Sequence, residues 1–430
     1  MFYYSTRSGK EDPNSRLSFE QAIFQGLAPD GGLYMPSLFP SLDPSFLTDI
    51  EHSSLVDTGT TILYPFMDSD IKTVKSIVSK AFTFPAPVHH IGGGFKVLEL
   101  FHGPTLAFKD FGARFMAQTM AHFRPKEKEI NILVATSGDT GGAVASAFSG
   151  LDGFRVYILF PRGKVSPIQQ RQLTTWDSNV IAIEVNGTFD DCQRLVKQAF
   201  TDQSLLSKKV FGSANSINIA RLLPQMTYYF EAYKQSADKS NLNMIVPSGN
   251  FGNLTAGLFA KKIGLPVSWF IAATNINDVI PQYLSSGNFL PKVSRETLSN
   301  AMDVGNPSNF SRMMELYVGK DQSSTWNNLR MEISGHITDD KTTLKNIREV
   351  YEQFGYIMDP HTAVAYEASK ALPGNNIIFS TAHWAKFAGT IEKAIDFVPD
   401  LPESLIGLLS KTEHKIQINA EYQELLEIIK

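Results

Sequence analysis

The sequence predicts an α/β protein with a mostly parallel sheet covered by helices on both faces. Unbroken apolar runs such as 130–138 ("INILVATSG") and 155–161 ("RVYILFP") are each followed by a helical pattern. Strands buried on both faces have this continuous apolar character, and their alternation with helices is typical of a parallel sheet. A third observation sets the start of the chain apart. Residues 1–90 alternate short helical patterns with turn clusters, which predicts a small, mostly helical N-terminal domain.

Beyond residue 90 the expected elements follow one another in a regular order. Strands are expected at 96–100, 130–138, 155–161, 179–185, 243–249, 267–274 and 375–383. Helices are expected at 111–123, 141–150, 166–176, 189–200 and 253–264. Ser166 followed by Pro167 is a helix-start signal, an N-cap and then proline at the first helical position. Cys192 shares an apolar helix face with Phe189 and Val196, which predicts a buried structural thiol.

The 430 residues are enough for two or three domains. We expect an N-terminal domain at 1–90, a catalytic α/β core at 91–400 and a tail at 401–430. Polar, Asn/Ser-rich sequence at 286–340 interrupts the strand-helix pattern and is interpreted as an insertion or subdomain edge.

Composition excludes several classes of protein. The net charge is -4 and no dense basic run occurs, so neither nucleic acid nor an anionic membrane is an expected partner. The single cysteine excludes an intrachain disulfide and a cysteine-based metal site, and no metal is expected. No apolar stretch approaches the ~20 residues of a membrane span, and the start lacks a signal-peptide core. The expected location is the cytoplasm.

Lys109 is the first candidate catalytic residue. It lies between Phe108 and Asp110, where a strand gives way to a helix. A lysine beside aromatic surface loses hydration, so its amine is more easily deprotonated and can form a Schiff base. A surface lysine at a helix start is the plainer alternative, although positive charge is unfavourable at that end of a helix.

Two glycine-rich turns are candidate anion sites. Ser137, Gly138, Asp139 and Thr140 form a strand-to-helix turn rich in hydroxyl and backbone N–H groups. The stretch 247–257 ("PSGNFGNLTAG") lets backbone amides approach a phosphate at a helix N-terminus. It is neither a Walker loop nor a dinucleotide-binding fingerprint. Each turn, taken alone, is also explained as a tight connection between a strand and a helix.

Two further segments place polar groups near the ends of expected elements. In 213–225 ("SANSINIARLLPQ"), Asn215 and Arg221 accompany an apolar run, which an ordinary capped helix would also show. Thr381 comes just past the last strand, where its hydroxyl could meet a cofactor ring. In a parallel sheet, ligands collect at the carboxyl ends of the strands, where all these segments are expected.

Taken together and in this order, the segments resemble the fold type II pyridoxal-phosphate enzymes, and within them the threonine synthase family. The resemblance rests on "LFHGPTLAFKDFGARFMAQ", "TSGDTGGAVA", "PRGKVSPIQ", "SANSINIARLLPQ", "VPSGNFGNLTAG", "IAATNINDV" and "TAHWAKF", and on "SFEQAIFQGLAPDGGLYMP" in the N-terminal domain. It implies a core of two open, mostly parallel sheets flanked by helices. It covers nearly the whole chain, apart from 286–340 and the tail beyond about 400.

The resemblance also implies roles for individual residues. Lys109 would be the Schiff-base lysine that binds pyridoxal 5'-phosphate, and Thr381 would meet the pyridine nitrogen. The turn 137–140 would receive the substrate carboxylate, while Asn215 and Arg221 would bind the substrate phosphate. The cofactor phosphate would be held by Gly249, Asn250, Phe251, Gly252 and Asn253.

The implied reaction is that of a carbon–oxygen lyase. O-phospho-L-homoserine and water give L-threonine and phosphate, by γ-elimination and addition of water at Cβ. Two alternatives stay open from sequence. A threonine or serine dehydratase would use the same lysine without a substrate-phosphate site, and a catalytically silent relative would keep the fold as a binding protein. Long-form members of the family suggest a monomer.

Overall fold

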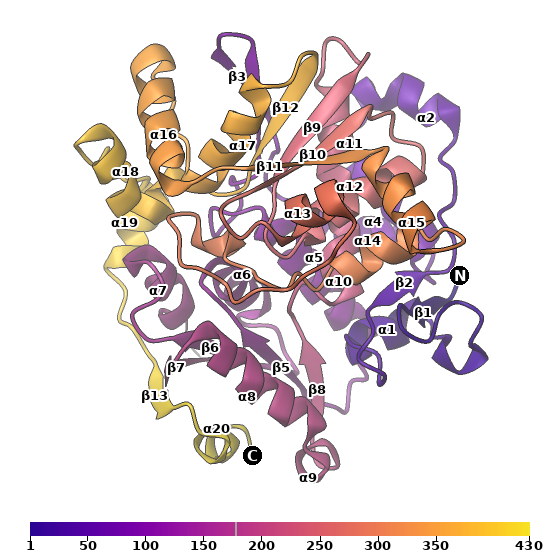
Figure 1. Cartoon of the computed structure of the whole chain (residues 1–430). Coiled ribbons are helices and arrows are strands. Elements are labelled where there is room, and N and C mark those ends of the chain that lie inside the picture. The colour runs from indigo at the N-terminus through magenta and orange to yellow at the C-terminus, as the bar shows by residue number, and fades with distance from the viewer. Residues whose placement is uncertain (177–178) are drawn as a thin grey trace.

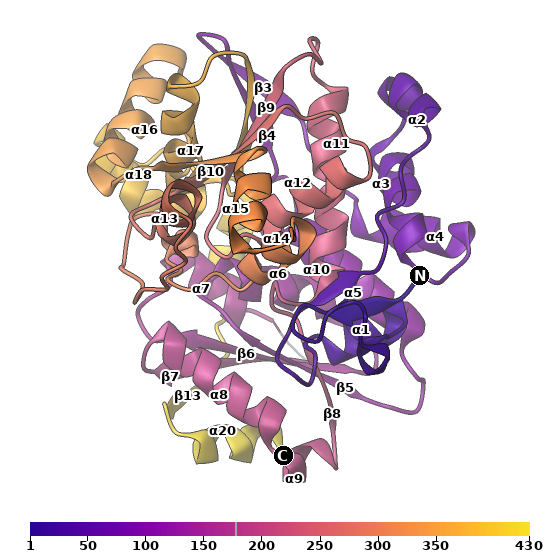
Figure 2. The ribbon, with the colours of Figure 1, turned by 45° about the vertical axis from the view of Figure 1, so that its right-hand side comes forward.

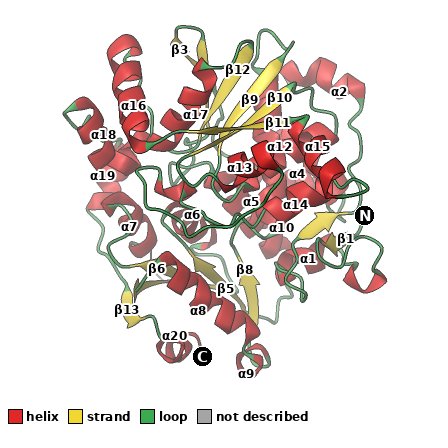
Figure 3. Cartoon of the chain, viewed as in Figure 1, coloured by secondary structure: helices red, strands yellow, loops and turns green. Residues whose placement is uncertain are grey.

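The computed structural model describes residues 1–176 and 179–430. In this part of the chain the strands form three sheets, two of them large (Figure 1). The six-stranded sheet lies in the upper half of the view and the five-stranded sheet in the lower half. Helices pack around and between both (Figure 3). The α/β class with two open sheets and a small N-terminal domain is therefore confirmed.

The six-stranded sheet is parallel except at one edge. Within this sheet, β3 and β4 pair antiparallel, and every other pair of neighbouring strands is parallel. Its spatial order is β11 (Ile333–Ile337), β10 (Trp269–Thr274), β9 (Leu242–Pro247), β12 (Asn375–Ser380), β4 (Phe95–Glu99) and β3 (Val88–Gly92).

The five-stranded sheet is parallel throughout. Its order is β13 (Ile416–Asn419), β7 (Val180–Asn186), β6 (Phe154–Pro161), β5 (Ile130–Ala135) and β8 (Val210–Ser213). Every residue of β5 is buried, because its alternate side chains pack into different clusters. Ile132 and Val134 join the main core, whereas Leu133 and Ala135 pack with Cys192 of α8 (Phe189–Thr201). The expected buried thiol is confirmed, and burial raises the pKa of Cys192 to about 12.

The N-terminal domain packs beside the core through short elements (Figure 2). A two-stranded antiparallel sheet joins its helices. The elements are β1 (Tyr3–Ser5), α1 (Phe19–Gln25), β2 (Tyr34–Pro36), α2 (Pro44–Asp49), α3 (Leu55–Leu63) and α4 (Ile71–Ala81).

The remaining helices connect and cover the two large sheets. They are α5 (Lys109–Phe123), α6 (Asp139–Phe148), α7 (Pro167–Thr174), α9 (Gln203–Leu206), α10 (Ile219–Leu222), α11 (Met226–Lys234), α12 (Gly252–Lys262), α13 (Val279–Ser286), α14 (Phe310–Leu316), α15 (Gln322–Arg330), α16 (Asp340–Phe354), α17 (Pro360–Lys370), α18 (Ala388–Ile395), α19 (Glu403–Leu409) and α20 (Tyr422–Ile429). Ser166 caps α7 as expected, with a reciprocal bond from its backbone N–H to the Gln169 side chain. None of the helices among the described residues is long and apolar enough to cross a membrane.

The two segments without diagnostic motifs complete the sheets. Segment 286–340 holds α14 and α15 and supplies the edge strand β11. The tail supplies edge strand β13, which pairs with β7, and α20, which packs against α8. The boundaries expected near residues 90 and 400 stay predictions.

One buried arginine joins segment 286–340 to the N-terminal domain. The Arg312 side chain is fully buried and bonds to four acceptors. Nε donates to the Tyr34 carbonyl (3.0 Å), Nη1 to Asn309 Oδ1 (2.7 Å) and the Ser216 carbonyl (3.5 Å), and Nη2 to the Ile217 carbonyl (2.6 Å). Burial lowers its pKa to about 9. Three separate segments therefore depend on one guanidinium group.

Replacing Arg312 with methionine is expected to destabilise the protein strongly. The substitution leaves buried carbonyl groups without donors, so the free energy of unfolding should fall by at least ~3 kcal/mol. The urea midpoint of the holoenzyme measures this. Arg348→Met is the control, because Arg348 makes an exposed ion pair with Asp396 worth ~1 kcal/mol or less. Equal midpoint shifts in the two variants would contradict the role of Arg312.

Candidate active site

Lys109 is the first residue of α5, at the carboxyl end of β4. Its ammonium lies 4.6 Å from the centre of the Phe108 ring, as the flanking aromatic predicted. Burial lowers the pKa of Lys109 to about 8, Asp139 opposes the shift, and the cations Arg221 and Lys386 add to it. The residue keeps partial exposure, so a ligand can reach it. The amine is thus suited to act as a nucleophile near neutral pH.

The loop before Lys109 is fixed by the neighbouring carboxylate of Asp110. This fully buried carboxylate accepts from Thr105 through the backbone N–H (2.8 Å) and the hydroxyl (2.7 Å). Burial raises the pKa of Asp110, although both hydrogen bonds oppose that change. Asp110 therefore shapes the loop and does not face Lys109 as a free base.

The same loop is joined to the segment that follows β12. Ala107 and Ala382 form an antiparallel bridge. The Phe108 N–H donates to the Thr381 carbonyl (2.9 Å), and the His383 N–H donates to the Leu106 carbonyl (3.0 Å). Leu106 adopts a left-handed φ of 56°, a strained conformation that such sites often hold. Thr381 thus lies beside the loop of Lys109, and no hydrogen bond among the described residues uses its Oγ1.

The turn 136–141 joins β5 to α6. Thr136 Oγ1 accepts from the amides of Gly138 (2.9 Å) and Gly141 (2.8 Å). Gly138 has φ 134°, and a Cβ there would lie 2.5 Å from Gln169. Within the described chain, no hydrogen bond is donated by the amides of Ser137 and Thr140, which are available at the start of α6 for an anion.

The Asp139 carboxylate of this turn already has partners inside the protein. It is 4% exposed and lies 2.7 Å from Lys386 Nζ and 2.9 Å from Gln169 Nε2. Burial acts against ionisation, but Lys386 and Lys109 together hold the pKa of Asp139 well below its usual range. The groups of the turn that remain available to a ligand are therefore the amides and hydroxyls of Ser137 and Thr140.

The loop 248–253 joins β9 to α12. Phe251 precedes α12 with a left-handed φ of 60°. Asn253 holds the loop internally, since its amide group donates to the Pro247 carbonyl (2.8 Å) and accepts from Ser248 Oγ (3.0 Å). Among the described residues, no hydrogen bond is donated by the amides of Asn250 and Phe251. Together with the free first N–H groups of α12, they form a second site for an anion.

Asn215 and Arg221 carry unpaired polar atoms on a third segment. Arg221 is 3% exposed and its Nη1 donates to the Ala214 carbonyl, but its Nε has no partner. Asn215 Oδ1 is also without one. Arg221 packs on α5, where a Cβ at Gly112 would lie 2.6 Å from its carbonyl oxygen. Burial lowers the pKa of Arg221 to about 10, and Asp110 opposes this shift. A buried, incompletely bonded guanidinium indicates an anionic ligand.

Direct contacts bring these segments together. Asn250 Nδ2 donates to Ser216 Oγ (2.5 Å), which joins the 248–253 loop to the segment of Arg221. Lys386 joins the turn of Asp139 to the loop of Lys109, because its Nζ also donates to the Thr105 carbonyl (2.8 Å). The carboxyl ends of β4, β5, β8, β9 and β12 thus meet at one place, as the sheet argument predicted.

Three contributors were not singled out from the sequence. They are Asp110, Gln169 and Lys386, and all three side chains are buried. Each lies in a motif whose predicted role rested on a different residue. Lys386 lies in the short 3-10 helix Trp384–Phe387, three residues after His383. A lysine in an apolar setting was a signal at position 109, and "HWAKF" offered the same signal at 386.

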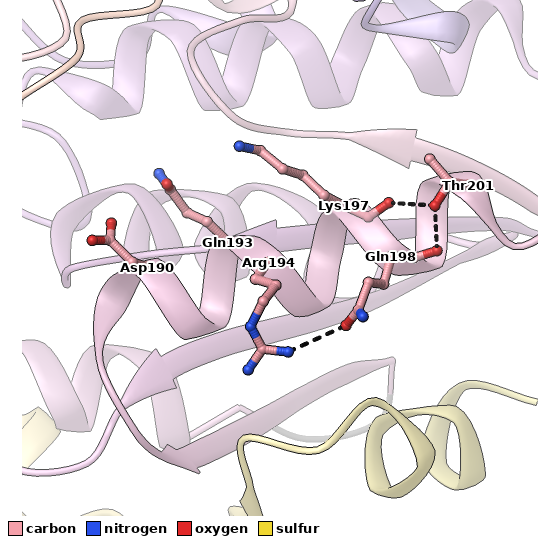
Figure 4. Close-up of a pocket in the computed structure, with 6 residues that line it drawn as sticks. All are labelled: Asp190, Gln193, Arg194, Lys197, Gln198 and Thr201. Carbon is pink, nitrogen blue, oxygen red and sulfur yellow. Dashed lines mark hydrogen bonds between the residues drawn. The ribbon is translucent and has the colours of Figure 1, made fainter. Parts of the chain in front are cut away.

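Other features of the surface do not compete with this site. A shallow hollow on the exposed face of α8 is lined by Asp190, Gln193, Arg194, Lys197, Gln198 and Thr201 (Figure 4). Arg194 of this hollow already has partners within the protein, since its Nη1 donates to Gln198 Oε1 (3.4 Å) and its Nη2 to the Ala420 carbonyl (2.8 Å). Among the described residues, no group of three or more His, Cys, Asp or Glu side chains could hold a metal ion.

Comparisons with known proteins identify the class. Residues 85–380 match the family "Pyridoxal-phosphate dependent enzyme", so the chain belongs to the pyridoxal-phosphate-dependent enzymes. Residues 2–82 match "Threonine synthase N terminus" and residues 362–429 match "Threonine synthase, C-terminal".

Relatives identify the family within that class. The chain is 46% identical over 402 residues to threonine synthase of Escherichia coli, with 92% of each chain covered. Its fold matches the crystal structure of that enzyme with TM-score 0.92, 42% identity and coverage of 100% and 99%. It also matches a PLP-bound threonine synthase from Brucella melitensis (TM-score 0.93, 35% identity, coverage 100% and 98%). The chain therefore belongs to the threonine synthase family, its cofactor is pyridoxal phosphate, and its activity is threonine synthesis and not dehydration or silent binding.

The geometry around Gly249 yields a test of the phosphate loop. A Cβ at Gly249 would lie 2.6 Å from Met302 Cα, a backbone atom that cannot turn away. Gly249→Ala should therefore displace the loop and weaken retention of pyridoxal phosphate by ~10-fold or more, which equilibrium dialysis measures.

Gly252→Ala is the matched control. Its Cβ would meet only side-chain atoms, Asn309 Nδ2 at 3.3 Å and Ser216 Cβ at 3.6 Å, and Gly252 has no left-handed φ. The positive φ of this loop is at Phe251, so branched substitution at 252 is not barred by backbone conformation. Stronger cofactor loss from Gly252→Ala than from Gly249→Ala would contradict this description of the loop.

Proposed function

We propose that Lys109 binds pyridoxal phosphate covalently in an enzyme that converts O-phospho-L-homoserine and water to L-threonine and phosphate. The observation that carries this proposal is a lysine of pKa about 8, placed beside two turns with free amides and a third segment with an unpaired guanidinium. The reaction needs a basic amine, a carboxylate site and two phosphate sites. The segments supply one candidate for each.

The cofactor phosphate would bind at the loop of residues 249–253. Its free amides and the start of α12 favour a dianion, and Gly249 lets the backbone stay close to Met302. Asn250 and Asn253 shape the loop through their side chains, so the phosphate would be held mainly by backbone groups. Thr381 would offer its hydroxyl to the pyridine nitrogen.

The substrate would be held at its two anionic ends. The amides and hydroxyls of Ser137 and Thr140 would bind the carboxylate, with Gly138 and Asp139 as internal support of the turn. Arg221 Nε and Asn215 would bind the γ-phosphate, which a dehydratase substrate lacks. Held at both ends, the substrate would have its Cα and Cβ directed toward the Lys109 amine.

Lys109 is the natural proton carrier of the reaction. When bound, pyridoxal phosphate stabilises the negative charge that develops at the substrate Cα. The Lys109 amine, once displaced by the substrate amine, would accept the Cα proton and return protons to the carbon chain. Its low pKa makes the neutral, proton-accepting form available near pH 8. Arg221 would stabilise the phosphate as it leaves.

The partners, cellular location and oligomeric state of the enzyme are also proposed, from its composition and its family. A net charge of -4 without a basic run supports a protein that binds no nucleic acid. A cytoplasmic location, expected from the apolar pattern of the sequence, and a monomeric state, which long-form members of the family suggest, are proposed with it.

Lys109→Ala is expected to abolish turnover of O-phospho-L-homoserine while preserving the fold. Borohydride reduction of the parent followed by peptide mapping should place the reduced cofactor on Lys109, and the variant should give no labelled peptide. Lys72→Ala, on the exposed surface of α4, is the control and should keep both activity and label. Label on a different lysine of the parent would contradict the assignment.

Arg221→Leu is expected to retain the cofactor but lose activity. Charged hydrogen bonds are worth roughly 1.5–3 kcal/mol, so kcat/KM for O-phospho-L-homoserine should fall by ~10- to 100-fold or more. Inorganic phosphate should inhibit the parent competitively and the variant much less. Loss of cofactor in the variant, with serine or threonine as its better substrate, would show that the two phosphate sites are assigned the wrong way round.

A further inference from the structure

Lys386 is a buried cation at the centre of the site whose role the reaction does not explain. Its side chain is 0% exposed, and its ammonium lies 2.7 Å from Asp139 Oδ1. The same ammonium donates to the Thr105 carbonyl (2.8 Å). Thr105 in turn holds the Asp110 carboxylate next to Lys109. One lysine thus contacts both the proposed carboxylate-binding turn and the loop that positions the catalytic amine.

The charges around Lys109 disfavour a proton on its amine. The charged groups that act on it are the carboxylate of Asp139 and the cations Arg221 and Lys386. The neighbouring carboxylate of Asp110 is bonded to Thr105. One anion and two cations leave a net positive charge beside position 109 before its own amine is protonated. Asp139 is the carboxylate that acts on Lys109, and Lys386 is the cation paired with it.

We propose that Lys386 is a positioning residue of the active site, which neutralises Asp139 and ties residues 137–140 to the loop of Lys109. By this pairing, Lys386 weakens the attraction by which Asp139 would keep a proton on Lys109. The proposal rests on the proposed role of Lys109. It differs from a purely structural ion pair in one respect: removing Lys386 should change the protonation of Lys109 and not only the stability of the fold.

The contacts of Asp139 and Lys386 determine whether the pKa of Lys109 rises or falls in each variant. In Lys386→Met, Asp139 keeps Gln169 but loses its cation, and the nearest remaining amine on which it acts is Lys109. Lys109 should then bind its proton more tightly. In Asp139→Asn the opposite holds, since Lys109 loses its attractive carboxylate and keeps two repelling cations. The double variant removes one charge of each sign and should return close to the parent.

Competitive labelling of the full-length chain measures this directly. The cofactor is removed with hydroxylamine, and the acetylation of Lys109 by acetic anhydride is followed against pH by mass spectrometry of its peptide. The midpoint of the pH dependence of Lys109 acetylation should be near pH 8 in the parent. This midpoint should rise by about one pH unit or more in Lys386→Met and fall in Asp139→Asn. In the double variant and in Lys386→Arg it should lie close to the parent value.

Lys415→Met is the matched control. Lys415 also pairs at 2.7 Å with a carboxylate that is 4% exposed, Glu184, but on the five-stranded sheet at β7 and β13. Its removal should leave the Lys109 midpoint unchanged. Circular dichroism checks that each variant is folded, and if Lys386→Met is not, Asp139→Asn and Lys386→Arg still decide the question.

An unchanged midpoint in folded Lys386→Met, or in Asp139→Asn, would overturn the proposal. Equal shifts in Lys386→Met and Lys415→Met would also overturn it, because they would indicate a general effect of charge. The outcome is separate from the proposed function. If borohydride reduction places the cofactor on another lysine, the role of Lys109 fails whatever the acetylation midpoints are.

Discussion

A single antiparallel bridge between Ala107 and Ala382 is the contact on which the arrangement of the site depends. It fixes the loop after β4 against the segment after β12, and so sets Lys109 beside Thr381. The two strands already pair in parallel within the six-stranded sheet, and the bridge adds an antiparallel contact between the segments that follow them. Lys386 then joins the five-stranded sheet to this loop through Asp139. The relative position of the two sheets therefore determines which groups surround Lys109.

The candidate anion sites consist mainly of groups that carry no full charge. Backbone amides at the starts of α6 and α12 donate no hydrogen bond among the described residues, while the buried carboxylates are bonded within the protein. This division has a physical reason, because an unpaired buried carboxylate would repel an anionic ligand. Left-handed Leu106 and Phe251 lie in the loop before Lys109 and in the loop before α12. Conformations of this kind cost ~1–3 kcal/mol and persist where the surrounding contacts hold them.

The sequence predicted the central strands and missed those at the edges. In the two large sheets four described strands went unrecognised, β3, β8, β11 and β13, and they are the edges of these sheets. The short strands β1 and β2 of the N-terminal domain were missed as well. An edge strand has a neighbour on one side only and needs no continuous apolar run, so "VHHIG" and "IQIN" resemble loops. Central strands such as β5 are buried on both faces and carry the apolar signal clearly.

The same distinction applies to the site. Lys109 and the two glycine-rich turns were visible because a local pattern marks each. The cation that pairs with Asp139 was not, since Lys386 is 247 residues away along the chain. Arg312 likewise bonds to Tyr34 and Ile217, far away in sequence. Contacts between residues so far apart in the sequence depend on how the two large sheets pack against each other, and no short motif encodes that packing.

The placement of the two phosphates is the central claim, and a crystal structure tests it most directly. The full-length protein would be crystallised with pyridoxal phosphate and an unreactive phosphonate analogue of O-phospho-L-homoserine. We predict the cofactor phosphorus against the amides of residues 250–253. The phosphonate should lie within hydrogen-bond distance of Arg221 Nε. Exchange of the two positions, or a phosphonate bound away from Arg221 and Asn215, would contradict the account.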